Sequence, residues 1–184
     1  MELKRVVVTG FGAITPVGNN AKDYWESLVK GESGAAPITL FDATNFKTKF
    51  ACEVKNFDPL NYFDKKESKK KDRNTQFGLV AAREAVEHSR IIEDHVDKNR
   101  VGVIWGSGIG GLSTFEKEVL EWAGTDIPRF NPFFIPKMIA DITGGQISIE
   151  YGFHGPNYTT VSACASSANA LIDGKMLIQL GKAD

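Results

Sequence analysis

The chain has 184 residues, of which 42% are hydrophobic and 24% charged, so it resembles an ordinary soluble globular protein, and we expect one domain over 1–184. A formal net charge of −1 argues against a nucleic-acid partner, and no apolar run approaches the roughly 20 residues of a membrane span. Two cysteines far apart in sequence, with few histidines, predict neither a disulfide scaffold nor a metal site and favour a reducing, cytoplasmic setting.

The first part of the chain predicts a strand, a helix and a second strand. The apolar run "RVVVTG" (5–10) is typical of a strand buried on both faces. A helix is expected in "NAKDYWESLVKGESG", where Asn20 caps the start and Gly31 suits a left-handed stop. The alternating "TKFACEVKNF" (48–57) predicts a half-buried strand, with Cys52 facing inward as a structural thiol.

The second part continues the alternation of helices and strands. After the charged run 64–73 we expect a helix whose inward face carries Phe77, Val80, Ala81, Ala85 and Val86. The later expected elements are a buried strand (101–106), a helix (112–124), an aromatic loop (126–139), a strand ending before Cys164 and a last helix (165–181). The pattern predicts an α/β fold with a mixed, largely buried sheet. Because "LGKAD" closes a helix where the next strand is due, the chain looks truncated.

A glycine motif follows the strand at 101–106. Gly106, Gly108 and Gly111 have the G-x-G-x-x-G spacing of a dinucleotide fingerprint. A Rossmann unit then needs a prompt return strand ending in an acidic residue, whereas this helix runs into the loop "TDIPRFNPFF". The glycines therefore indicate either a tight turn or close approach of a ligand to the backbone.

Cys164 lies at the expected junction between a strand and a helix, in "TTVSACASSANAL". A thiolate at a helix start is stabilised by backbone N–H groups, which can also serve an oxyanion formed when a carbonyl is attacked. Small neighbours leave room for a substrate. From the residues alone, Cys164 is either a nucleophile or a small packed core thiol.

Five motifs resemble those of a known enzyme family. The segments "RVVVTGFGAITPVG", "GSGIGG", "NPFFIP", "YGFHGPN" and "VSACASS" occur in the order and spacing of the elongating β-ketoacyl-[acyl-carrier-protein] synthases, with the closest similarity to synthase II. The resemblance implies the N-terminal half of a thiolase-like fold, a homodimer and no cofactor. It implies that Cys164 takes an acyl chain from a carrier-protein thioester. Malonyl carrier protein then loses CO2, and its carbanion attacks the acyl-enzyme to give a 3-oxoacyl chain.

The resemblance also implies roles for other residues. Ile109 and Phe134 would line the acyl channel, and "NYTTV" (157–161) would pair with its copy across the dimer. Residues expected to dock the acidic acyl carrier protein are Lys66, Lys69, Lys70 and Arg129. The alternatives are ordinary loop packing for Phe134 and a solvated face for the charge run.

The family's catalytic histidines and a supporting lysine lie in a half that is absent from these 184 residues. His88, His95 and His154 do not occupy family catalytic positions. We therefore expect the chain alone not to catalyse condensation. A runner-up hypothesis is a non-catalytic carrier-binding or dimer-forming partner half, although such subunits usually replace the nucleophile. A nucleotide-binding domain is a third.

Overall fold

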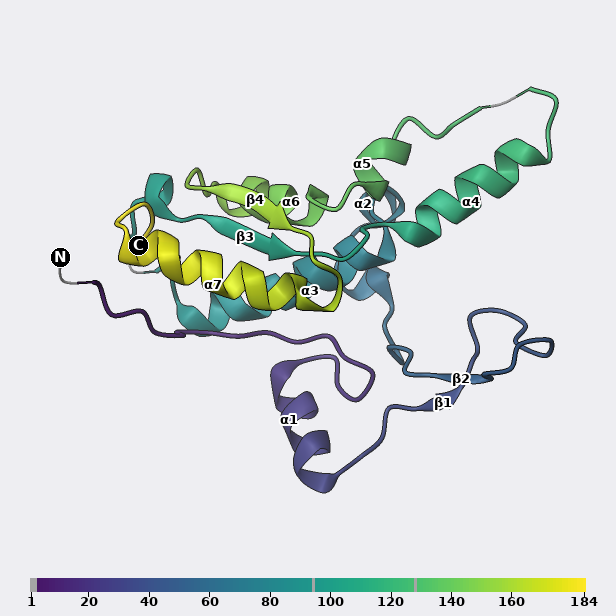
Figure 1. Cartoon of the computed structure of the whole chain (residues 1–184), viewed down its shortest axis with the longest axis horizontal. Coiled ribbons are helices and arrows are strands. Elements are labelled where there is room, and N and C mark those ends of the chain that lie inside the picture. The colour runs from purple at the N-terminus through teal and green to yellow at the C-terminus, as the bar shows by residue number, and fades with distance from the viewer. Residues whose placement is uncertain (1–2, 94, 128) are drawn as a thin grey trace.

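The computed structural model describes residues 3–93, 95–127 and 129–184 (Figure 1). Three short 3-10 turns accompany the helices and strands. In chain order the elements are α1 (Ala21–Lys30), β1 (Ala36–Pro37), β2 (Phe50–Ala51), η1 (Pro59–Asn61), α2 (Lys65–Lys69), α3 (Arg73–Ser89), η2 (Lys98–Arg100), β3 (Val103–Gly106), α4 (Leu112–Ala123), α5 (Phe134–Met138), α6 (Ile142–Tyr151), β4 (Asn157–Thr160), η3 (Ala163–Ala165) and α7 (Ser166–Gln179).

The centre of the molecule is the parallel pair β3 and β4, in register from Val103 opposite Asn157 to Gly106 opposite Thr160. Helix α7 contacts both strands, α6 contacts both strands as well, and α3 packs against α6. The result is a three-layer arrangement. Helix α7 approaches the strands at Gly106, and α6 and α3 approach the neighbouring residue Trp105, which faces the opposite side. This arrangement brings the end of β4 to the start of α7, where Cys164 lies.

The hydrophobic core lies between α3, α6 and the segment preceding α2. Its buried members are Phe57, Phe63, Leu79, Val80 and Ile147. Leu79 is the most buried of them at 1% exposed, whereas the sequence pattern placed the inward face of α3 on Val80 and its helical neighbours. The predicted face of α3 is confirmed at Val80, which is buried, and at Phe77, which packs against this core, and the buried face extends to Leu79.

Several elements match the sequence predictions. In α1, the Asn20 side chain accepts a hydrogen bond from the Asp23 N–H at 2.8 Å, and Gly31 has φ +70°. The strand β3, the helices α4 and α7, and the strand β4 lie where the sequence pattern placed them. Helices α2, α5 and α6 were not predicted, and α5 (Phe134–Met138) corrects the loop expected over 126–139. Helices α2 and α5 are only five residues long, and α6 contains two glycines.

The predicted buried strand over 5–10 is wrong for this structure. No ladder involving residues 3–10 is present among the described residues, and Val8 is 82% exposed. The end of the segment instead packs on α3, because a Cβ on Gly10 would lie 2.5 Å from the Ala85 carbonyl oxygen. A strand needs a hydrogen-bonded neighbour, and in the described part of the chain none lies beside it.

The single mixed, largely buried sheet is also not found. The described strands form two separate pairs, the parallel β3 and β4 and the antiparallel β1 and β2. Strand β2 covers only two residues, and both Phe50 and Cys52 are exposed, which corrects the inward placement of Cys52. Apolar side chains on α1 and α7, such as Trp25 and Leu171, also face outward. Within the described residues, no helix is long and apolar enough to cross a membrane.

Candidate active site

Cys164 lies in the short turn η3 that joins β4 to α7, and its side chain is exposed. The predicted junction of strand, cysteine and helix is therefore present. The preceding residue, Ala163, has φ +49°, a left-handed conformation that residues with a Cβ seldom adopt. Strain of this kind persists only where surrounding contacts hold it, and here it lies directly before Cys164.

Ser166 supplies those contacts. Its side chain is buried, with the residue only 3% exposed. Its hydroxyl accepts a hydrogen bond from the Ser162 N–H at 2.9 Å and donates one to the Ala163 carbonyl at 2.8 Å. The two bonds close the turn around Cys164 from both sides. We call this arrangement the Ser166 clasp.

Two further side chains support the Ser166 clasp. The Thr160 hydroxyl donates to the Ser166 carbonyl at 2.7 Å and so connects the end of β4 to the first residue of α7. The Asn169 amide donates to the Ser162 hydroxyl at 2.6 Å. The sequence pattern indicated Ser166 only as a small neighbour of Cys164, and it did not indicate Thr160 or Asn169. A serine two positions after a cysteine at a strand-helix junction was the signal that could have found the clasp.

The glycine loop, residues 107–111, follows β3 and lies against this turn. A Cβ on Gly106 would lie 2.6 Å from Ser167 Cα, so glycine is needed for α7 to approach β3. Gly110 has φ +91°, and a Cβ on Gly108 would be 3.8 Å from the Ala163 carbonyl oxygen. Protein backbone thus occupies the approach to Gly106 that a dinucleotide phosphate would need, which disfavours the nucleotide-binding hypothesis.

The two predicted acyl-channel residues have different surroundings. Ile109 projects from the middle of the glycine loop and is 68% exposed. Phe134 stacks on Phe130, with ring centroids 5.4 Å apart, and on Phe115 of α4 at 6.4 Å. Phe134 therefore belongs to an aromatic stack between α4 and α5, so the packing alternative describes its contacts in this structure.

Three of the four predicted docking cations gather at α2. Lys66 and Lys69 are exposed, whereas Lys70 donates a hydrogen bond to Glu67 at 2.7 Å. Lys71 donates to the same carboxylate at 2.9 Å. These hydrogen bonds lower the pKa of Glu67 from its usual 4.5 to about 2, and the bond from Lys70 contributes more than the bond from Lys71. Glu67 thus stays ionised near neutral pH and offsets part of the positive charge of α2.

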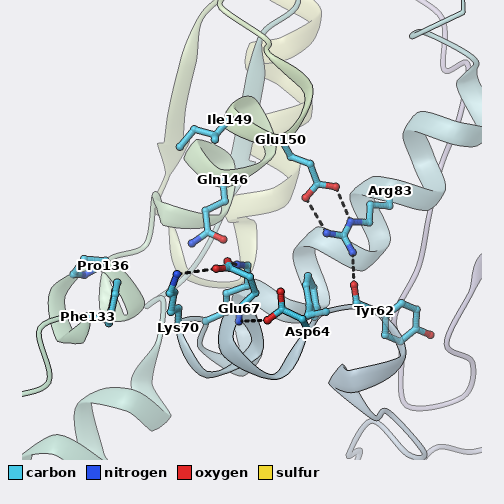
Figure 2. A pocket seen from close by; sticks show the side chains of 12 residues that line it. Tyr62, Asp64, Glu67, Lys70, Arg83, Phe133, Pro136, Gln146, Ile149 and Glu150 are labelled. Atoms are coloured by element: carbon cyan, nitrogen blue, oxygen red, sulfur yellow. Dashed lines mark hydrogen bonds and ion pairs between the residues drawn. The ribbon is translucent and has the colours of Figure 1, made fainter.

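A cavity of about 580 Å³ opens beside α2 (Figure 2). Arg83 of α3 binds Glu150 of α6 through two hydrogen bonds of 2.6 and 3.0 Å, and it also donates to the Tyr62 carbonyl at 2.9 Å. Lys70 lies at the opposite wall, with its ammonium 5.7 Å from the centre of the Phe133 ring. The three cations that line the cavity are therefore all paired with carboxylates, Lys70 and Lys71 with Glu67 and Arg83 with Glu150.

The described contacts join neither Arg129 to the lysines of α2 nor a histidine to Cys164. Arg129 is exposed on the loop between α4 and α5, and no described hydrogen bond or ion pair joins it to α2. The His88 ring packs on Phe11, with centroids 4.9 Å apart. Among the hydrogen bonds described for residues 3–93, 95–127 and 129–184, none joins a histidine to Cys164. The structure thus brings together Cys164 and the glycine loop, and no hydrogen bond among the described residues joins an acidic or basic side chain to the Cys164 sulfur.

Comparison with known proteins identifies similar sequences and structures. A family model described as "Beta-ketoacyl synthase, N-terminal domain" matches residues 3–184. A 3-oxoacyl-[acyl-carrier-protein] synthase 2 from Synechocystis sp. is 42% identical over 183 residues, which are 100% of this chain and 44% of that protein. The chain thus spans less than half the length of this curated relative.

Two solved structures share the fold. The ishigamide ketosynthase/chain length factor superposes with a TM-score of 0.90 at 28% identity, over 100% of this chain and 46% of that one. A ketosynthase in complex with its type II PKS acyl-carrier protein, bound to the hexaketide, superposes with a TM-score of 0.83 at 28% identity, over 100% and 50%. The three-layer arrangement is therefore the N-terminal half of a thiolase-like ketosynthase fold.

Proposed function

The chain belongs to the β-ketoacyl synthase family, as its N-terminal domain, and we propose that it provides the nucleophile of a 3-oxoacyl-[acyl-carrier-protein] synthase in fatty-acid elongation. The observation that carries the proposal is the exposed Cys164 in the strained turn between β4 and α7. The glycine loop lies next to this turn, and Gly108, where a Cβ would be 3.8 Å from the Ala163 carbonyl oxygen, adds no side chain near the thiol.

The proposed reaction has two stages. The Cys164 sulfur attacks the carbonyl carbon of an acyl thioester, the carbonyl electrons move to oxygen, and the carrier thiol leaves when the carbonyl re-forms. We expect the backbone N–H of Cys164, at this helix start, to stabilise the oxyanion. A malonyl thioester then loses CO2, and its carbanion attacks the Cys164 thioester. The products are a 3-oxoacyl thioester two carbons longer and the free Cys164 thiol. The groups that assist the decarboxylation lie outside these residues.

Brief exposure to a limiting acyl carrier thioester, followed by peptide mass spectrometry, tests the proposal. We expect the acyl group on Cys164 and not on Cys52, although both thiols are exposed. The difference would arise from the helix start and the clasp around Cys164. Equal labelling of the two cysteines, or no labelling, would contradict an activated nucleophile.

The basic surface of α2 is our proposed docking site for acyl carrier protein. We expect Lys69→Glu to weaken binding about 3- to 10-fold at low ionic strength, since it replaces attraction to an acidic partner with repulsion. Glu67→Gln should strengthen binding, because it releases Lys70 and Lys71 from the carboxylate that they share. The dissociation constant of the carrier, measured at low and high salt, gives both effects.

The matched control is Lys22→Glu on α1, which makes the same charge change away from α2. Both docking effects should shrink as added salt screens exposed charges over a Debye length of about 8 Å near physiological ionic strength. A Glu67→Gln variant that binds no better than the original protein would indicate that the charges of α2 form only a solvated face.

Two surfaces support a homodimer. Strand β4 has β3 as its only ladder partner among the described residues, so its other edge is open to a second strand. Helix α4 extends from the body of the molecule (Figure 1) and exposes the apolar side chains of Leu120 and Trp122. An open strand edge and an uncovered apolar helix, each on its own, favour association with a second copy.

We expect Val161→Lys to convert the dimer to a monomer in sedimentation or light-scattering measurements. Val161 follows β4 and is exposed, so a lysine there should change the stability of a single subunit little. In a dimer paired through β4, the same substitution would place two positive charges at the shared edge. Leu40→Lys, on the loop between β1 and β2, is a control at an equally exposed apolar position. Unchanged mass in the Val161 variant would refute pairing through β4.

A second candidate is a non-catalytic partner half. It is favoured by the similarity to the structure described as a ketosynthase/chain length factor. The retained thiol at Cys164 favours the catalytic role, and selective acylation of Cys164 would decide between the two.

A further inference from the structure

Asp72 is a buried carboxylate that serves two helices. It is 6% exposed and is the N-cap residue of α3, where its Oδ1 accepts a hydrogen bond from the Asn74 N–H at 2.9 Å. Its Oδ2 accepts from the Thr114 N–H at 3.1 Å and from the Thr114 hydroxyl at 2.5 Å. One side chain therefore satisfies free N–H groups at the start of α3 and, 42 residues later, at the start of α4.

Helix α4 depends on this remote carboxylate. Its own N-cap position is Gly111, which has no side chain and makes no capping hydrogen bond. Gly111 is also closely surrounded, because a Cβ there would lie 3.1 Å from the Asp72 carboxylate and 2.3 Å from the Lys137 carbonyl oxygen. The first turn of α4 is thus fixed by tertiary contacts and not by a local cap.

The same contacts fix the end of the glycine loop. At its start, the Ser107 N–H donates to the Thr160 carbonyl at 3.2 Å, next to the turn that holds Cys164. At its end, the Gly111 N–H donates to the Met138 carbonyl at 2.9 Å, and the first turn of α4 binds Asp72. Ile109 lies between these two attachments.

We propose that Asp72 is a positioning residue: its buried carboxylate holds the end of the glycine loop to the start of α3 and so determines where Ile109 stands relative to the Cys164 turn. Asp72 comes shortly after the proposed docking lysines of α2 in sequence, so the same short segment carries the docking surface and the carboxylate that holds the glycine loop. A consequence follows that rests on the proposed function. Because Ile109 is the residue expected to line the acyl channel, its position then affects the length of acyl chain that Cys164 accepts.

The test uses Asp72→Asn in the full-length protein. Asparagine has one carbonyl oxygen, so it can cap only one of the two helices while keeping nearly the size of aspartate. Thr114→Val is the second variant, because it removes the hydroxyl hydrogen bond to Asp72 without changing α3. Asp58→Asn is the control, since Asp58 caps only its own turn η1 and is exposed.

Hydrogen exchange measures the position of the loop directly. We expect Asp72→Asn to speed exchange of residues 107–114 about tenfold, with a smaller increase for Thr114→Val and none for Asp58→Asn. Exchange in α7 should stay unchanged in every variant. Unchanged exchange at 107–114, or an equal increase throughout the chain, would overturn the proposal.

Acylation by short-chain and long-chain carrier thioesters measures the consequence. We expect the ratio of the two rates to change about fivefold in Asp72→Asn, while alkylation of Cys164 by iodoacetamide, which needs no acyl channel, keeps its rate. A constant ratio beside faster loop exchange would refute the link to chain length. If the unaltered protein is not acylated at Cys164, the proposed function fails, and exchange at 107–114 still decides the role of Asp72.

Discussion

Replacing Cys164 with alanine should slow acyl transfer from a carrier thioester by roughly 10³-fold or more, because it removes the proposed nucleophile, and the other exposed thiol, Cys52, does not precede a helix. Intact-mass measurement should find no acyl adduct on this variant. Condensation activity of the full-length protein should fall with it. Cys164 is exposed, so the substitution leaves the packing around it intact, and the melting temperature should change little.

Cys52→Ala is the matched control. Cys52 is also a free, exposed thiol, but it follows the short strand β2 and does not precede a helix. Acylation of Cys164 should proceed at its original rate in this variant. Continued acyl transfer by Cys164→Ala, or its loss in Cys52→Ala, would assign the nucleophile to a different residue.

Ser166→Ala should slow acylation of Cys164 roughly 10- to 100-fold, since small displacements of a reacting group have effects of this size. The substitution removes the hydrogen bond to the Ala163 carbonyl and leaves the Ser162 N–H without its acceptor. Loss of such a partner at a buried site costs about 1–3 kcal/mol in the free energy of unfolding. Ala163 could then relax from φ +49° and turn the thiol away from the substrate path.

The control for this prediction is Ser167→Ala, one residue further along α7 and exposed. The rate of iodoacetamide alkylation of Cys164, measured beside the melting temperature, separates misplacement of the thiol from general instability. A folded Ser166→Ala protein whose Cys164 reacts at the original rate would show that the clasp does not position the nucleophile.

The local pattern of the sequence was sufficient to predict α1 with its cap and stop, β3, α4, β4 and α7. It was also sufficient for the position of Cys164 at the end of a strand and the start of a helix. These features depend on neighbours within a few residues: hydrophobic periodicity, capping side chains and glycine. Family membership was likewise accessible from motifs in order along the chain.

Burial and long-range hydrogen bonding were decided only by the tertiary structure. The apolar run 5–10 has the composition of a buried strand, yet no described strand pairs with it, and Cys52 is exposed although it alternates with apolar residues. Asp72 resembles an ordinary N-cap until Thr114 is placed beside it by the fold. The physical reason is that the composition of a segment determines its tendency to be buried or capped, whereas only the arrangement of distant segments provides the partner.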